Sequence, residues 1–504
     1  MPRTSQSLVA IVALLVLLGM PILEALTARS SDAAAQSGSQ PNILVIQTDD
    51  MRADDLAAMP KTKALLKAGG MSFDNYIAGG TPLCCPNRAT ALTGQYPHNH
   101  GVLRNGGARG GHGAFVDTGS EQRTIAVALQ AAGYWTGYTG KYMNGYPANQ
   151  PEHIPPGWNE WISFTNDGEK EHGGDGQYYT YNLNENGTIL RLGSKPRKYS
   201  TDVITGKSLR IIERAPEQQP LFLWVSPFAP HSPAIPAPRD KKADVPTAFQ
   251  SSSFNQRGQG KASWIRELPR LKDEEIRTVE RRNVQRRRSP LAVDDMVETL
   301  VVAMPGPSYV FFISDNGYML GEFRIPYGKI VPYKPAAEVP LLVLGPGIAA
   351  GSRSSVVVSS IDLAPTWAAI GDAAMGDVDG RNLLPLLRGD GDLPNPRRNL
   401  LLEWSGLTDA SLEADLDGDS FHSLRKAKTN AAVPKPLPFV ALRAADWLYV
   451  EWDEGAGEGT KEYYDHATDP NELNNIYATL SPERQQELTA RVGALKTCAG
   501  GTCD

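Results

Sequence analysis

Short apolar runs recur along the chain, and each one leads into a polar segment. Four of them are rich in β-branched or aromatic residues or in Leu, and they cover residues 42–46, 221–225, 309–313 and 340–344. Continuous apolar runs of this length are typical of strands buried on both faces of a parallel sheet. Segments with the helical spacing of apolar residues lie among them, at 55–69, 122–132 and 290–304. The alternation predicts an α/β fold in which a large, mostly parallel sheet is sandwiched by helices.

The pattern changes after a break rich in Gly, Asp and Pro at 389–398. Two strand-like runs and an amphipathic helix follow it, at 399–404, 441–452 and 481–496. We therefore expect a main α/β domain over 41–389 and a smaller C-terminal α+β domain over 390–504.

The first residues have the features of an export signal. Arg3 precedes an apolar run over 8–20, which is short for a bilayer span, and the three alanines at 33–35 offer a cleavage site. We expect residues 1–35 to be a signal peptide and the start of a linker. The protein is then secreted or periplasmic, with no stable membrane span after cleavage. An uncleaved membrane anchor stays open, because residues 22–23 could lengthen the run.

Composition and charge narrow the class of protein. The chain has 504 residues, of which 41% are hydrophobic and 21% are charged, as is ordinary for a globular protein with a full-sized core. The net charge of -6 provides no overall basic surface, so no nucleic-acid partner is expected. A local basic run is predicted to be the solvated face of a helix; it comprises Arg281, Arg282, Arg286, Arg287 and Arg288.

Only four cysteines are present, in two close pairs. Cys498 and Cys503 lie near the C-terminus, and in an exported protein they predict a small terminal disulfide. Cys84 and Cys85 are adjacent, a spacing at which a disulfide is strained, and there is no further pair to complete a structural zinc site. A chemical role for one of these two residues is therefore the better interpretation.

Oxygen-bearing side chains follow two of the predicted strands. Asp49 and Asp50 come just after the first run, and Asp315 and Asn316 follow the run at 309–313. Polar residues at the carboxyl ends of parallel strands are where such sheets bind ligands. Carboxylate and amide oxygens suit Ca²⁺ or Mg²⁺, so the four side chains predict an oxygen cage for a divalent cation.

The segment Cys84-Cys85-Pro86-Asn87-Arg88, followed by a Thr-Gly turn, resembles the C-x-P-x-R maturation motif of the sulfatase family. In that family the first Cys of the motif is converted to formylglycine, an aldehyde. The resemblance covers most of residues 41–480. Within the family, the sequence is most similar in character to the branch of N-acetylglucosamine-6-sulfatases and extracellular heparan sulfatases. The segments that carry this likeness include 96–100, 141–146, 184–187 and 292–295.

The resemblance implies an alkaline phosphatase-like fold and a role for each matching residue. The metal ligands would be Asp49, Asp50, Asp315, Asn316 and the modified Cys84, holding Ca²⁺ or, as a second possibility, Mg²⁺. The catalytic residues would be Cys84 as formylglycine, Arg88 to steady the aldehyde hydrate, Lys141 and Lys329 to bind sulfate, and His231 to contact sulfate or protonate the leaving oxygen. Lys334 competes with Lys329, and the Gly-Lys context favours Lys329.

The chain departs from the family pattern at two positions. Asn87 stands where the motif usually has Ser, and Met143 stands where many arylsulfatases have a His. The glucosamine-sulfatase branch also lacks that His. Two further histidines, His98 and His100, either line the substrate pocket or pack the turn after the motif.

The function expected from the resemblance is an exported sulfatase. Its substrate would be a sulfated carbohydrate or an aryl sulfate, and a formylglycine-generating enzyme would mature it. Two alternatives stay open. One is a phosphodiesterase or phosphonate monoester hydrolase of the same superfamily. The other is a non-catalytic protein that binds sulfated glycans and keeps Cys84 as a thiol.

Overall fold

The computed structural model describes residues 40–147, 150–165, 176–390, 399–406, 436–455 and 459–503. The expected signal segment lies outside this part of the chain. Within it, no helix is both long and apolar enough to cross a membrane. From Gln40 onward the chain forms one unit.

A ten-stranded sheet forms the centre of this unit, in the order β10-β2-β9-β8-β1-β7-β3-β4-β5-β6. Its four middle strands are parallel, namely β8 (Ser308–Ser314), β1 (Asn42–Thr48), β7 (Leu221–Ser226) and β3 (Trp135–Gly140). The flanking strands are β10 (Ser352–Ser359), β2 (Met71–Ile77), β9 (Leu341–Leu344), β4 (Glu160–Phe164), β5 (Asn182–Glu185) and β6 (Thr188–Arg191). Of these, β9 runs antiparallel to both of its neighbours.

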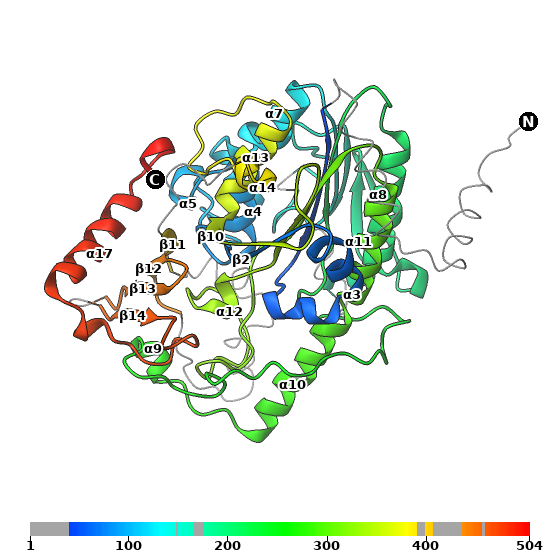
Figure 1. Ribbon diagram of the computed structural model, residues 1–504. Helices are drawn as coiled ribbons and strands as arrows, with labels where there is room; N and C mark the ends of the chain where they lie inside the picture. Colours follow the sequence, from blue (N-terminus) through cyan, green and yellow to red (C-terminus); the bar gives the residue numbers. More distant parts are fainter. Residues whose placement is uncertain are drawn as a thin grey trace, which may run out of the picture. The chain divides into compact units, whose positions relative to one another are not determined.

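Helices cover both faces of this sheet, which is why its middle strands β1, β7 and β8 are largely apolar and almost entirely buried (Figure 1). One face carries α4 (Cys84–Thr93), α7 (Ile125–Ala131) and α13 (Leu363–Ile370), and the other carries α8 (Ser200–Arg214) and α11 (Leu291–Ala303). All seven residues of β1 are buried, and Val45 pairs with Trp224 on one side and Phe311 on the other. The predicted α/β fold, with a large and mostly parallel sheet between helices, is confirmed.

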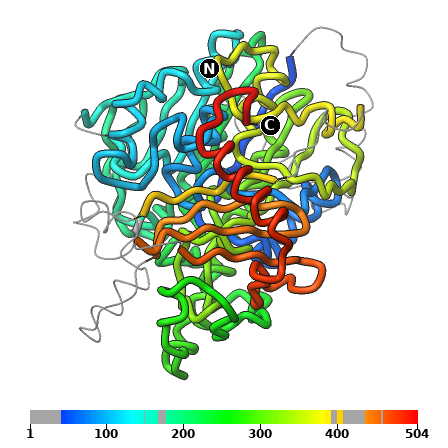
Figure 2. Tube along the Cα trace, turned by 90° about the vertical axis from the view of Figure 1, so that its left-hand side faces the viewer, coloured from blue at the N-terminus to red at the C-terminus, as the bar shows by residue number. Residues whose placement is uncertain are grey.

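A second, antiparallel sheet follows in the C-terminal part. Its strands are β11 (Leu400–Trp404), β12 (Phe439–Arg443), β13 (Trp447–Trp452) and β14 (Lys461–Asp465), in that order. Helix α17 (Pro482–Leu495) lies across these strands, as Figure 2 shows in red over orange. The run predicted as one strand over 441–452 is a hairpin instead, because the chain turns at 444–446 between β12 and β13.

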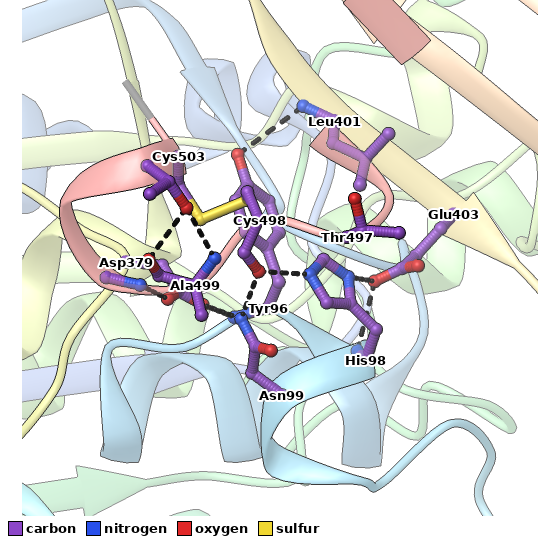
Figure 3. Close-up of a disulfide and its surroundings, with 12 residues drawn as sticks. Tyr96, His98, Asn99, Asp379, Leu401, Glu403, Thr497, Cys498, Ala499 and Cys503 are labelled. Carbon is purple, nitrogen blue, oxygen red and sulfur yellow. Dashed lines mark hydrogen bonds and ion pairs between the residues drawn. A yellow bond between two sulfur atoms is a disulfide. The ribbon is translucent and has the colours of Figure 1, made fainter. Parts of the chain in front are cut away.

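The predicted terminal disulfide joins Cys498 and Cys503. Figure 3 shows that it lies against the short helix α5 (Pro97–His100), which follows α4 in the chain. The carbonyl oxygen of Cys498 accepts hydrogen bonds from Asn99 Nδ2 at 2.9 Å and from His98 Nε2 at 3.0 Å. His98 also contacts Glu403 through Nδ1 at 2.8 Å. The disulfide loop is therefore docked by polar contacts, and His98 belongs to that docking.

The helix predicted over 55–69 is broken into three short pieces. They are η2 (Ala53–Ala58), α3 (Pro60–Thr62) and the π-helical η3 (Lys63–Lys67). Pro60 has no N–H and excludes the preceding residue from helical geometry, so the helix restarts there.

The basic run lies on α10 (Asp273–Arg288) and is not a solvated face throughout. Arg281 is exposed, but Arg286 and Arg287 are only 2% and 1% exposed. The prediction of a solvated basic face is therefore wrong for these two residues. Both turn inward to carboxylates of the η2 segment: Arg286 Nη2 lies 3.1 Å from Asp55 and Arg287 Nη2 lies 2.9 Å from Asp54.

Candidate active site

The parallel strands deliver the predicted site residues to one edge of the large sheet. Asp49 and Asp50 follow β1, Asp315 and Asn316 follow β8, Lys141 follows β3, and His231 lies in the loop after β7. Cys84 and Arg88 lie on the first turns of α4, and Lys329 lies in the loop between β8 and β9. The contacts below bring all nine residues into one buried cluster.

Cys84 is the first residue of α4 and is completely buried. Its Sγ lies 2.9 Å from Lys329 Nζ, 3.6 Å from Lys141 Nζ and 3.6 Å from Asp49 Oδ1. Burial raises the pKa of the Cys84 thiol well above its ordinary value, although the two lysines act in the opposite direction. An unmodified Cys84 would thus remain a neutral thiol, a weak nucleophile.

Arg88 lies one turn after Cys84 and holds two strand ends together. Its Nε donates to Asp315 Oδ2 at 2.8 Å, and its Nη1 donates to the carbonyl oxygen of Lys141 at 2.6 Å and to Ser226 Oγ at 2.7 Å. Because the guanidinium presents several donors in fixed directions, this side chain sets the distance between the Lys141 segment and Asp315.

The oxygen side chains fit a divalent cation. Ligand atoms of Asp49, Asp50, Cys84 and His231 all lie within 4.8 Å of one another. Oδ1 of Asn316 is buried without a hydrogen-bond partner, which is the state expected of an atom whose partner is an ion. The carboxylate and amide oxygens among these atoms are ligands that hard cations prefer.

The acidic and cationic side chains of the site balance one another. They are the carboxylates of Asp49, Asp50 and Asp315 and the cations of Arg88, Lys141 and Lys329. Three negative and three positive charges sum to zero, so a bound dication brings the site to +2, a charge complementary to sulfate. Burial would raise the pKa of Asp49, but Lys141 and the other nearby cations outweigh it, so its pKa lies well below the ordinary value and the carboxylate stays ionised.

Both predicted lysines reach the centre of the site. Lys141 Nζ lies 2.5 Å from Asp49 Oδ2, and Lys329 Nζ lies 2.6 Å from Asp50 Oδ1. Lys334 does not take part, because its side chain is 46% exposed and pairs with Glu338 at 3.4 Å. The choice of Lys329 over Lys334 is therefore consistent with the geometry.

His231 approaches the site from the loop after β7. Its Nε2 lies 3.8 Å from Asp50 Oδ2, and its Nδ1 lies 2.9 Å from the carbonyl oxygen of Ser232. A carbonyl can only accept, so Nδ1 carries the proton in this arrangement, and Nε2 is the atom that faces the cluster.

The structure accommodates both departures from the family pattern. Asn87 is buried, and its Nδ2 donates to the carbonyl oxygen of Gly79 at 3.2 Å and to Ser360 Oγ at 3.0 Å. It thereby ties α4 to the start of the 360–370 helical segment. Met143 is 3% exposed and packs in the main hydrophobic core. Neither residue disrupts the cluster.

Two residues of the site had not been predicted. Ser226 ends β7 and binds Arg88 through Oγ, and the Tyr138 hydroxyl donates to the carbonyl oxygen of Lys141 at 2.5 Å. Both hold the backbone beneath Lys141. Only their place at the ends of β7 and β3 could have suggested them from the sequence.

Three other histidines lie in packed hydrogen-bond networks. His100 is fully buried and bonds Thr90 Oγ1 at 3.0 Å, so it packs the turn after the motif. His112 and His153 each contact one carboxylate oxygen of Glu121 through Nε2 at 2.9 Å.

Known proteins share both the sequence and the fold. Residues 41–373 match the Sulfatase family. Human N-acetylglucosamine-6-sulfatase is 33% identical over 487 residues, covering 92% of this chain and 86% of that protein.

Two solved structures show the fold. A protein solved in complex with its substrate D-glucosamine-2-N,6-O-disulfate has a TM-score of 0.71 and 21% identity, covering 90% of this chain and 97% of that one. The phosphonate monoester hydrolase of Agrobacterium radiobacter has a TM-score of 0.65 and 20% identity, covering 90% and 95%. The family match and the long alignment with the human relative show the family. Sulfatases are metal-dependent and carry a formylglycine made from a Cys. This chain belongs to the sulfatase family and is a sulfuric ester hydrolase.

Proposed function

We propose that this sulfatase removes the 6-sulfate ester from N-acetylglucosamine units of sulfated carbohydrate, using formylglycine at position 84 and a bound Ca²⁺. The observation that carries the proposal is the position of Cys84, between the oxygen ligands and the two lysines. The amino-sugar substrate is supported by the relative named above, which aligns over 92% of this chain.

Two groups supply the chemistry that the twenty amino acids lack. A hydrated formylglycine at position 84 would supply two geminal hydroxyls, one as a nucleophile and one as the proton donor needed for the release of sulfate. A bound cation supplies charge neutralisation for the nucleophile and the sulfate oxygens.

The side chains of this site would bind and orient the ester. Lys141 and Lys329 both place their ammonium groups close to position 84, so they would neutralise sulfate oxygens as negative charge develops. Arg88 would hold the Lys141 segment and Asp315 at a constant separation during turnover. His231 donates through Nδ1 to a carbonyl, so when its Nε2 is protonated as well it would give the Nε2 proton to the leaving sugar oxygen.

We also propose that the cation is Ca²⁺ and that the protein is exported. Calcium accepts an irregular set of oxygen ligands, whereas Mg²⁺ demands near-octahedral geometry. Export rests on residues 1–35, with the basic start and apolar run described above. Maturation would need a formylglycine-generating enzyme in the host.

Mass spectrometry of the peptide containing Cys84, from protein made in its native host, tests the modification. The proposal expects the mass loss that accompanies conversion of CH₂–SH to CHO. Protein with an unconverted Cys84, from a host that converts other sulfatases, would instead favour the glycan-binding alternative.

Matched substrates test the reaction. N-acetylglucosamine 6-sulfate, N-acetylglucosamine 6-phosphate and an aryl sulfate are compared for kcat/KM with Ca²⁺ present. We expect the sugar sulfate to be preferred and Cys84→Ala to abolish turnover, while Cys85→Ala, its neighbour in the motif, retains it. A preference for the phosphate ester would favour the phosphoester alternative.

A further inference from the structure

Asp50 has a backbone conformation that needs support. Its φ is 65°, in the left-handed region that non-glycine residues seldom occupy. Asp is among the residues that tolerate this region best, yet such a conformation persists at a functional site only when its surroundings hold it. The amide N–H of Asp50 is held by Asp315 Oδ1 at 3.0 Å. Its carbonyl oxygen is held by a residue outside the cluster.

That residue is Arg286, on α10. Its Nη2 donates to the carbonyl oxygen of Asp50 and, at 3.1 Å, to Asp55 Oδ2. Its Nη1 donates to the carbonyl oxygen of Pro230 at 3.4 Å, and the guanidinium stacks 4.4 Å from the ring centre of Tyr318. The side chain is 2% exposed, so these contacts form out of water.

Each of these partners belongs to a loop that carries a site residue. Asp50 follows β1, Pro230 immediately precedes His231, and Tyr318 lies two residues after Asn316. A single guanidinium thus joins the loops that follow β1, β7 and β8. Its planar fork can reach two carbonyls and a carboxylate at once, whereas a Lys ammonium cannot reproduce these directions.

The preceding turn of α10 repeats the arrangement. Arg282 Nη1 donates to Ser232 Oγ at 3.1 Å, and its guanidinium lies 4.3 Å from the ring centre of Tyr327. Ser232 follows His231, and Tyr327 lies two residues before Lys329. One face of α10 therefore contacts the loops that follow β1, β7 and β8, the last of them at both Tyr318 and Tyr327.

We propose that Arg286 is a positioning residue for the cation site: by holding the carbonyl oxygen of Asp50 in its left-handed conformation, it directs the Asp50 carboxylate toward the bound cation. The inference rests on the proposed cation site. It goes beyond it by assigning a role to a helix that contributes no ligand.

Arg287 offers a matched control. It is adjacent on α10, is 1% exposed, and pairs with Asp54 at 2.9 Å and Asp55 at 3.8 Å. Its hydrogen bonds go instead to Asp54, to Asn283 of its own helix and to the carbonyl oxygen of Ala248. If Arg286 served only as a buried ion-pair partner of Asp55, replacing Arg286 or Arg287 by Lys would change the Ca²⁺ affinity to a similar extent.

The test measures Ca²⁺ affinity by calorimetry, and kcat and KM separately, for wild type, Arg286→Lys and Arg287→Lys. Loss of an outer contact to a ligand typically weakens metal binding 10- to 100-fold. We expect Arg286→Lys to raise the Kd for Ca²⁺ about tenfold or more and to lower kcat with little change in KM. Arg287→Lys should keep the Kd within about twofold of wild type.

Equal Kd values for the two variants would overturn the proposal. If Arg286→Lys does not fold, Tyr318→Leu, which removes the ring beneath the guanidinium, is measured instead. We expect it to raise the Kd at least about threefold, and an unchanged Kd would again overturn the proposal. A wild-type protein that neither binds Ca²⁺ nor hydrolyses sulfate esters would contradict the proposed function instead, so the two failures are distinguishable.

Discussion

Lys329 Nζ lies 2.9 Å from Sγ of Cys84, although the two residues are 245 positions apart in the chain. The same ammonium lies 2.6 Å from Asp50 Oδ1. Position 84 and one of the acidic residues therefore share a single cation. A sulfate ester attacked from position 84 would meet this positive charge at the point where negative charge develops.

Lys329→Ala should lower kcat about 100- to 1000-fold, the usual cost of removing one preorganised contact to a developing charge. Lys334→Ala is the control, because that side chain is 46% exposed and lies outside the cluster. Steady-state kinetics on a sulfate ester measures both. A large loss in Lys334→Ala with a small one in Lys329→Ala would show that the two lysines were assigned the wrong way round.

Glu472 should make stability depend on pH. It is 1% exposed and lies 2.9 Å from Arg443 Nη1. Burial would raise its pKa, but Arg443 and His466 outweigh burial and lower the pKa from 4.5 to about 2. Because the folded-state pKa is depressed, this stabilisation is complete above pH 4.5 and is lost as the pH falls toward about 2.

A fall in pKa from 4.5 to about 2 corresponds to roughly 3 kcal/mol. Glu472→Gln should therefore lower the free energy of unfolding by roughly this amount at pH 7, and by clearly less at pH 3. Denaturant titrations at the two pH values measure the difference. Glu487→Gln, at a side chain that is 67% exposed, should change stability little at either pH. A loss for Glu472→Gln that is independent of pH would contradict the prediction.

The disulfide should stabilise the fold modestly. The two cysteines are five positions apart, and closing so short a loop removes chain entropy worth about 2 kcal/mol. We expect Cys503→Ser to lower the free energy of unfolding by about this amount and to leave kcat unchanged, since the loop docks on α5 away from Cys84. A variant that loses activity while remaining folded would indicate a link between this loop and the site.

Asn87→Ala should destabilise the protein. The substitution removes the two hydrogen bonds that the buried Asn87 Nδ2 donates, to the carbonyl oxygen of Gly79 and to Ser360 Oγ, and each such bond contributes about 0.5–1.5 kcal/mol. Asn75→Ala is a suitable control, because Asn75 makes a comparable bond to the carbonyl oxygen of Ser355 at the surface. Thermal unfolding compares the two. Equal losses of stability in the two variants would mean that the burial of the Asn87 amide adds nothing to its contribution to stability.

The sheet and the central cluster could be predicted from the sequence because both follow from strand ends. An apolar run followed by Asp49 and Asp50, and another followed by Asp315 and Asn316, place oxygen atoms at the same edge of a parallel sheet. The lysines and His231 came from the family resemblance rather than from the pattern.

The burial of individual arginines in the basic run of α10 could not be predicted from the sequence. Arg281 and Arg286 belong to the same helix and the same run of charges, yet one is exposed and the other is 2% exposed. Which arginine turns inward depends on the loops after β1 and β7, which are far away in the sequence. The helical spacing of the charges alone therefore does not predict which arginine is exposed and which is buried.

The distance between the site residues along the chain has a consequence for how the protein folds. Asp50 and Lys329 meet although 279 positions separate them, and β1 pairs with β7 and β8 in parallel. Bringing such distant segments together costs loop-closure entropy before any favourable contact energy is gained, so domains of this kind fold slowly. We therefore expect the cation cluster to assemble late in folding. A chain arrested before Lys329 emerges lacks the ammonium that pairs with Asp50, and it exposes unpaired strand edges until the later strands are made.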